Sequence, residues 1–155
     1  MRIVLYQPEI PPNTGNIARL CAATATPLHL IEPLGFKIDD KHLKRAGLDY
    51  WPNVNLYVHP HWAAFESALI SVGPSRVVLT SARGGVPHHD FRFEPGDAIV
   101  LGPETRGLPE FLFDLCPLRV RIPTLDTVRS LNLSTAAGIL LYESLRQTNG
   151  LGALS

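Results

Sequence analysis

Three short segments combine glycine or small residues with hydrogen-bonding side chains in a spacing that suits ligand binding. They are residues 13–19 (NTGNIAR), 101–109 (LGPETRGLP) and 130–135 (SLNLST). Each stands next to the start of a predicted helix. Because open α/β sheets bind ligands at the carboxyl ends of their strands, we expect the three segments to form one composite site.

The segment 101–109 has the features of a polar nest between a strand and a helix. Gly102 permits a tight turn, Glu104 and Arg106 project from the loop, and Gly107 leads into the next helix. Successive backbone amides in such a turn form a concave, polar surface. A plain strand–turn–helix joint with solvated charges is the alternative interpretation of this segment taken alone.

The segment 13–19 places three hydrogen-bonding side chains at a predicted helix start. Asn16 and Arg19 are three positions apart and therefore share a helical face. The amides of a helix amino terminus favour an anion. The simpler alternative is that Asn13 only caps the helix and Arg19 points into solvent.

The segment 130–135 precedes a helix that is rich in alanine and glycine on one side. Ser130 or Asn132 can cap this helix, and capping needs only one polar residue. Ser134 and Thr135 add further hydroxyl groups, and this surplus favours a ligand site. The small side chains beyond it would let another backbone pack closely.

A fourth segment carries the densest basic patch of the chain. Lys41, Lys44 and Arg45 fall on one face of a predicted helix, where they would bind phosphate or simply form a solvated face.

The remaining signals for other kinds of site are weak. His59 and His61, like His88 and His89, fit no known ligand spacing, so we expect loop histidines and no metal site. The sequence has no GxGxxG after its first strand, no P-loop and no GxSxG. The common nucleotide and hydrolase sites are therefore disfavoured.

Short apolar runs alternate with helical patterns along the chain. Strands are predicted at 2–6, 28–31, 54–58, 76–81, 97–101 and 118–122, and helices from 13 or 14 to 24, from 39 or 40 to 46, and at 62–70, 108–115 and 133–146. Residues 149–155 are expected to be a frayed tail. This alternation predicts the α/β class, with a mostly parallel sheet covered by helices on both faces.

Length and composition limit the class of protein to which the chain can belong. The chain has 155 residues and 45% hydrophobic residues, which suits one domain spanning 1–155. Its formal net charge is zero, so any nucleic-acid contact needs a local basic patch. Cys21 and Cys116 are expected to be small buried hydrophobes. No signal-peptide pattern and no long apolar run are present, which predicts a cytoplasmic protein without a membrane segment.

At its polar segments the chain resembles the SPOUT class of methyltransferases, and within it the TrmL-like group of tRNA wobble-nucleotide 2'-O-methyltransferases. The resemblance is carried by residues 13–16 with Arg19, residues 101–108, and Ile122–Pro123 followed by 129–134. The stretches 4–12 and 44–51 are also similar to this group. The match covers almost the whole chain, although residues 84–93 and 124–128 look less typical.

The resemblance implies an α/β fold whose carboxyl-terminal part forms a trefoil knot. It implies S-adenosylmethionine as the cofactor, S-adenosylhomocysteine as the product, no metal, and a homodimer that packs the first and last helices across subunits. The implied substrate is the wobble nucleotide, a cytidine or a 5-substituted uridine, in the anticodon stem-loop of tRNA. The expected reaction is methyl transfer to the ribose 2'-hydroxyl.

The resemblance also assigns residues to the two halves of the site. Leu79, Gly102, Ile122, Ser130 and Leu131 would line the cofactor pocket, and Lys41, Lys44 and Arg45 would contact RNA. Arg19 is the candidate for activating the hydroxyl, supported by Asn13, Glu104, Ser130 and Asn132. Because a guanidinium stays protonated in proteins, we expect Arg19 to hold a phosphate and stabilise the developing alkoxide.

Three alternatives differ in what the same fold would do. The chain could be a non-catalytic RNA-binding module, a 2'-O-methyltransferase for another tRNA or rRNA site, or an enzyme that binds a dinucleotide. The intact motif residues disfavour the first alternative, and the missing glycine fingerprint disfavours the last.

Overall fold

The computed structural model describes residues 1–39, 41, 45 and 51–155. Its strands are β1 (Arg2–Tyr6), β2 (Leu28–Ile31), β3 (Leu56–His59), β4 (Val77–Thr80), β5 (Val86–Pro87), β6 (Ala98–Leu101) and β7 (Leu118–Arg121). Its helices are α1 (Pro11–Ala23), α3 (Trp62–Ser71), α4 (Glu110–Leu115) and α5 (Leu133–Gln147), with short 3-10 turns η1 (Trp51–Asn53) and η2 (Leu151–Leu154).

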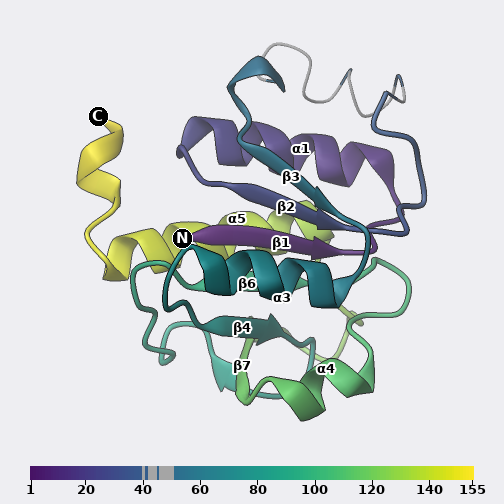
Figure 1. Ribbon diagram of the computed structural model, residues 1–155. Coiled ribbons are helices and arrows are strands. Elements are labelled where there is room, and N and C mark those ends of the chain that lie inside the picture. Colours follow the sequence, from purple (N-terminus) through teal and green to yellow (C-terminus); the bar gives the residue numbers. More distant parts are fainter. Residues whose placement is uncertain (40, 42–44, 46–50) are drawn as a thin grey trace.

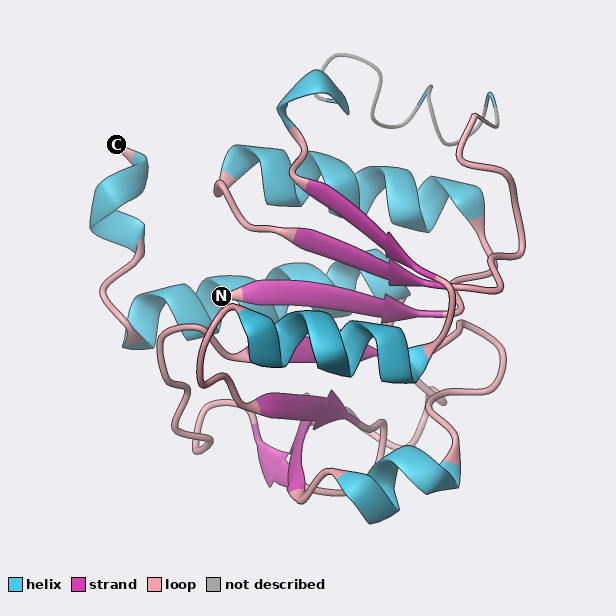
Figure 2. Cartoon of the chain, in the orientation of Figure 1, coloured by secondary structure: helices cyan, strands magenta, loops and turns pink. Residues whose placement is uncertain are grey.

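The strands form one sheet in the order β3-β2-β1-β6-β4-β7-β5, and every strand pair in it is parallel. The arrowheads of β1, β2 and β3 accordingly point to the same side of the molecule (Figure 2). The α/β class and the parallel sheet predicted from the sequence are confirmed. The trefoil knot stays a prediction that rests on the resemblance.

Side chains alternate along the central strand and supply two cores. Ile3 and Leu5 of β1 pack against α1 and α5, whereas Val4 and Tyr6 pack against α3 and α4. Figure 1 shows α3 in front of the sheet and α5 behind it. Because both faces are covered there, the central strands β1, β4 and β6 are almost continuously apolar, as buried parallel strands are.

Helix α1 begins earlier and is capped differently than the sequence predicts. It starts at Pro11, its N-cap is Ile10, and no side chain of the cap residue bonds the helix amides. The expected caps, Asn13 and Thr14, are instead buried within the first turns. Proline suits the first helical positions because its missing N–H would have no partner there.

The histidines expected in loops have structural roles. His59 ends β3 and is buried, with its Nε2 atom 2.9 Å from Nδ1 of His29. Burial lowers the pKa of His59, which favours the neutral ring. His61 caps α3 by accepting a hydrogen bond from the Ala64 amide.

The segment around residues 84–93 contains a strand that the sequence did not predict. Its two-residue strand β5 pairs with β7 at the sheet edge, and Phe91 and Phe93 then enter the core. At the end of the chain, residues expected to fray form η2, and Leu151 packs against the core. Within the described residues, no helix is both long and apolar enough to cross a membrane.

Both cysteines are buried and free, as predicted. Burial raises the pKa of the Cys21 thiol to about 12, so this side chain behaves as a small apolar group.

Candidate functional site

A cavity of about 870 Å³ lies where the loops after β4, β6 and β7 meet the amino-terminal ends of α1 and α5. All three of these loops leave the carboxyl ends of parallel strands, where open α/β sheets bind ligands. The segments 13–19, 101–109 and 130–135 each contribute lining residues. The chain thus brings together in space the three polar segments that its sequence separates.

Glu104 joins the β6 loop to the start of α1. Its carboxylate accepts hydrogen bonds from the amides of Glu9 (2.9 Å) and Ile10 (2.8 Å), and from Nδ2 of Asn13 (3.2 Å). A negative charge at a helix amino terminus satisfies unpaired amides and is favoured by the helix dipole. Glu104 therefore replaces the side-chain cap that α1 lacks.

Asn13 and Asn132 join α1 to α5. Nδ2 of Asn132 donates to Oδ1 of Asn13 at 3.1 Å, while Oδ1 of Asn132 accepts from the amides of Ser134 and Thr135. Asn132 is thus the N-cap of α5, one of the two caps predicted. Glu104, Asn13 and Asn132 form a continuous chain of hydrogen bonds, named here the polar relay.

Thr105 adds a reciprocal contact between the same loops. Its amide donates to Oε1 of Glu9 at 3.0 Å, and its hydroxyl contacts the same oxygen at 2.8 Å. These hydrogen bonds, with the nearby charge of Arg106, lower the pKa of Glu9. The loops after β1 and β6 therefore hold one another in place beside the cavity.

A side chain at Gly102 would collide with the backbone of the loop that follows it, which agrees with the tight turn expected there. A Cβ atom at this position would lie 2.5 Å from the Leu108 nitrogen and 2.6 Å from the Gly107 carbonyl carbon. The loop curls back over the end of β6, and Gly107 turns it with a φ of 68°. Glycine at 102 thus preserves the loop that forms the cavity wall.

The expected cofactor residues divide into two groups. Gly102, Ile122, Ser130 and Leu131 line the cavity. Leu79 does not line it, because its side chain is fully buried in the core beneath α3 and α4. Thr80 and Ser81, the next residues along the chain, take part in the lining instead.

Of the residues expected to meet the substrate, Asn13, Glu104, Ser130 and Asn132 line the cavity, whereas Arg19, Lys41 and Arg45 lie outside it. Arg19 and Asn16 are exposed on α1, which agrees with the shared face predicted for them, and neither lines the cavity. Lys41 and Arg45 are also exposed and stand apart from the lining, and Lys44 lies outside the described residues.

Sequence reasoning missed part of the lining. Four arginines, Arg83, Arg106, Arg121 and Arg129, line the cavity together with Phe113. Arg106 and Arg129 fall within segments that were recognised, although neither received a role. Nothing local in the sequence distinguishes Arg83 and Arg121, because they are brought together only by the pairing of β4 with β7.

Residues 1–142 match the SpoU rRNA Methylase family. The chain belongs to this family. A structure solved to describe the 2-OH methylation of C/U34 on tRNA is 50% identical, with a TM-score of 0.91 over 96% of each chain. The SpoU methyltransferase AviRb from Streptomyces viridochromogenes, solved in complex with AdoMet, is 27% identical, with a TM-score of 0.83 over 95% of this chain and 60% of that one.

Two relatives of about the same length are described as methyltransferases that act on cytidine 34 of tRNA. A tRNA (cytidine(34)-2'-O)-methyltransferase from Methylovorus glucosotrophus is 53% identical over 154 residues, which cover 98% of each chain. The protein with the same description from Escherichia coli K12 is 46% identical over 156 residues, covering 99% of this chain and 98% of that one.

Proposed function

We propose that this protein transfers a methyl group from S-adenosylmethionine to the ribose 2'-hydroxyl of the wobble nucleotide, position 34, of tRNA. The observation that carries the proposal is the 53% identity to a cytidine-34 enzyme over 98% of both chains. The lining residues Asn13, Gly102 and Asn132 all belong to the segments that carry the family pattern. We expect the reaction to take place in the cytoplasm.

The cavity fits the proposed cofactor in size and chemistry. Its volume of about 870 Å³ falls in the usual range for small-molecule sites. Ile122, Leu131 and Leu108 offer apolar contact, and the backbone of the 102–107 loop offers polar groups. When bound, S-adenosylmethionine supplies a methyl group that its sulfonium already activates.

The protein's own groups must then position the ribose and stabilise charge. Arg19 is assigned to hold a neighbouring phosphate and stabilise the oxygen as it loses its proton, since its guanidinium stays charged. The polar relay of Glu104, Asn13 and Asn132 would fix the loops that orient cofactor and hydroxyl. Correct alignment of two reactants accounts for a large part of such catalysis.

The position of Arg19 is the reason why the proposal includes a homodimer. Arg19 is exposed and lies outside the cavity of its own chain. An exposed stripe on α5 contains Thr135 and Tyr142, and a Cβ at Gly138 between them would meet no atom within 4 Å. A second copy packed on α1 and α5 would bring its Arg19 to the first copy's cavity.

The function is tested by methyl transfer to tRNA. Purified protein with labelled S-adenosylmethionine should modify tRNA, and mapping should place the label at the 2'-oxygen of nucleotide 34. Label at another tRNA or rRNA position would support a different substrate, and no transfer to any RNA would support a non-catalytic RNA-binding module.

The contribution of two subunits is tested with mixed dimers. Arg19→Ala should lose nearly all activity and keep cofactor affinity, whereas Gly102→Val should lose cofactor affinity. Heterodimers of these two variants contain one intact cavity facing one intact Arg19, so they should recover about half of the wild-type rate. Inactive heterodimers would show that Arg19 serves the cavity of its own chain.

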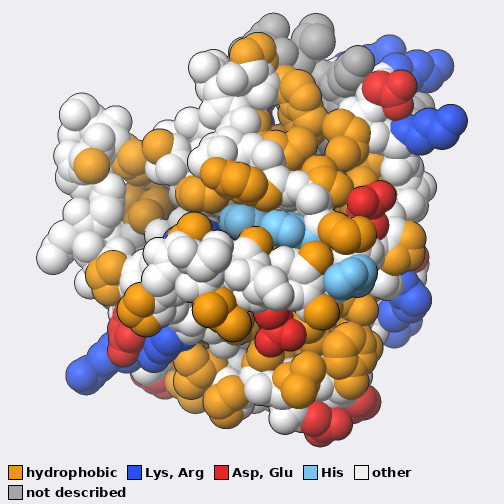
Figure 3. Space-filling model, in the orientation of Figure 1, with side chains coloured by type: hydrophobic (Ala, Val, Ile, Leu, Met, Phe, Trp, Pro, Cys, Tyr) orange, Lys and Arg blue, Asp and Glu red, His pale blue; other side chains and the backbone are white. Residues whose placement is uncertain are grey.

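The basic patch of Lys41, Lys44 and Arg45 keeps its proposed role as an RNA contact. Lys41 and Arg45 are both exposed, which such a role requires. On the face drawn in Figure 3, basic side chains lie at the margins and hydrophobic ones cover much of the centre. RNA binding by a chain of zero net charge must therefore depend on local clusters.

A further inference from the structure

A second, smaller hollow adjoins the large cavity and is dominated by arginine. Its volume is about 130 Å³, and the residues that line it are Ala82, Arg83, Arg121, Thr124, Asp126, Val128 and Arg129. Arg83, Arg121 and Arg129 line both the hollow and the cavity, so a group bound in one would lie beside a group bound in the other. We call these three residues the arginine cluster.

The arginine cluster has more positive charge than its surroundings neutralise. Arg121 donates from Nε to the Gly85 carbonyl oxygen at 3.2 Å, which fixes the side chain without using its terminal nitrogens. Across the described residues, neither Arg121 nor Arg129 has a carboxylate within 4 Å, the limit that defines an ion pair. Three guanidinium groups therefore face one carboxylate, that of Asp126.

The pairing of that carboxylate is weak. Asp126 lies 3.7 Å from Arg83, and the two side chains are 98% and 70% exposed. Exposed pairs at this distance contribute little and are easily displaced. A ligand with negative charge and several acceptor oxygens would therefore gain more from the cluster than Asp126 does.

We propose that the arginine cluster binds a backbone phosphate of the RNA substrate and so delivers the target ribose to the cavity. This inference rests on the proposed function. The planar guanidinium fork matches a phosphate in a bidentate geometry. In single-stranded RNA each ribose is flanked by phosphates, so a phosphate fixed in the hollow places the adjoining sugar at the cavity mouth. Arg83, Arg121 and Arg129 would thus select a single-stranded, splayed nucleotide.

Substitution of Asp126 tests the proposal, because two possible roles of this residue predict opposite changes in tRNA affinity. The carboxylate of Asp126 lines the hollow and should repel an incoming phosphate, because both groups are negative. Asp126→Asn should therefore tighten tRNA binding by a few-fold. If Asp126 instead served to hold Arg83 in a needed position, the same change would weaken binding.

The experiment measures binding of unmodified tRNA to the full-length protein by fluorescence anisotropy over a series of salt concentrations. Arg121→Gln and Arg129→Gln should each weaken binding by about 10-fold. Each should also reduce the slope of log affinity against log salt by about 0.7. Arg129→Lys should keep the slope, because the charge remains, and lose part of the affinity.

Arg92→Gln is the matched control, since Arg92 is exposed and lies outside both the cavity and the hollow. Calorimetry with S-adenosylmethionine is the second measurement, and the cluster variants should lose much less affinity for the cofactor than for tRNA. Effects no larger than that of Arg92→Gln would overturn the proposal. So would a loss of cofactor affinity with an unchanged salt slope, because the cluster would then hold the cofactor's carboxylate.

These binding measurements do not depend on methyl transfer. A wild-type protein that binds tRNA through the cluster without methylating it would refute the proposed function and leave the phosphate site supported.

Discussion

Glu104 shows how a single side chain can organise two loops of the site. One of its oxygens accepts from the Glu9 amide and the other from the Ile10 amide and from Asn13. All of these partners are donors, so they match the two acceptor oxygens of a carboxylate. A glutamine of the same length would turn an NH₂ group toward at least one donor.

Glu104→Gln should therefore lower the free energy of unfolding by about 1–2 kcal/mol, through the lost cap and the lost charge at the helix amino terminus. Urea unfolding followed by circular dichroism measures this change. Asp114→Asn is the control, because Asp114 is exposed on α4 and belongs to neither loop, and it should stay within about 0.5 kcal/mol of the wild type. Equal effects of the two substitutions would contradict a capping role for Glu104.

At the scale of elements, the amino terminus of α5 combines a cap with a contact to α1. Oδ1 of Asn132 serves the cap, and Nδ2 serves Asn13. Aspartate keeps the first function and adds a favourable charge, but it has no donor for the second. The two roles of Asn132 can therefore be separated by substitution.

Asn132→Asp should leave the free energy of unfolding within about 0.5 kcal/mol of the wild type, whereas Asn132→Ala should lower it by about 1 kcal/mol. Both variants should lose most methyl transfer, because each breaks the polar relay beside the cavity. Thermal unfolding and methyl transfer to tRNA are measured on the same preparations. Full activity of Asn132→Asp would show that only the cap matters.

The elements themselves were largely predictable, since buried parallel strands and capped helices leave local patterns. The start of α1 was not predictable from local sequence, because the carboxylate that caps it belongs to Glu104. This residue accepts from the Glu9 amide, from which it is 95 residues away in the sequence. Strand β5 has only two residues and is defined by its pairing with β7, so no local pattern predicts it. The arginine cluster was missed for the same reason, since it exists only after β4 and β7 pair.

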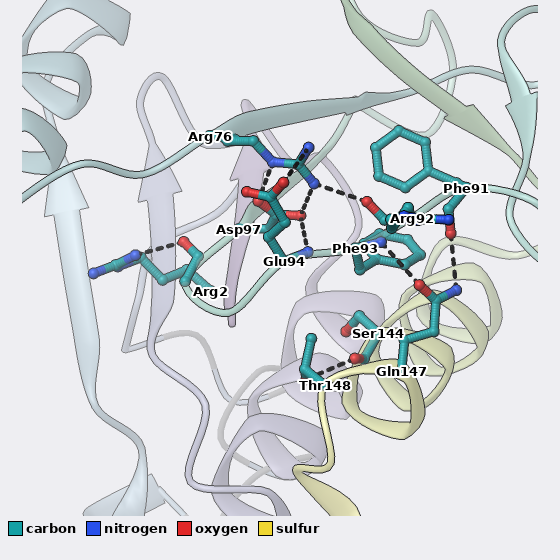
Figure 4. Close-up of polar contacts among 11 residues, drawn as sticks. Arg2, Arg76, Phe91, Arg92, Phe93, Glu94, Asp97, Ser144, Gln147 and Thr148 are labelled. Carbon is teal, nitrogen blue, oxygen red and sulfur yellow. Dashed lines mark hydrogen bonds and ion pairs between the residues drawn. The ribbon is translucent and has the colours of Figure 1, made fainter.

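At the scale of the whole molecule, the site and the ion pair between Arg76 and the buried Asp97 occupy opposite ends of the sheet. Asp97 precedes β6 and is only 1% exposed, and it accepts hydrogen bonds from Nε (2.8 Å) and Nη2 (2.7 Å) of Arg76. Figure 4 shows this pair beside Gln147 of α5, whose side chain bonds the backbone of Phe91 and Phe93. These contacts tie the segment before β6 to the last helix, far from the carboxyl-terminal ends of the strands that carry the cavity.

Asp97→Asn should therefore affect stability and leave chemistry intact. The asparagine amide has a single oxygen and cannot accept both Arg76 hydrogen bonds in this geometry. The positive charge of the guanidinium would then lack its partner, which should lower the free energy of unfolding by about 3 kcal/mol. The urea midpoint should fall, while methyl transfer and cofactor affinity at low temperature should match the wild type. Asp90→Asn is the control, because among the described residues the Asp90 carboxylate pairs with the exposed His89 at 3.7 Å and with no buried group, and the urea midpoint of this variant should not move. A loss of activity in folded Asp97→Asn protein would mean that the far end of the sheet is coupled to the site, since the ion pair touches no residue of the cavity.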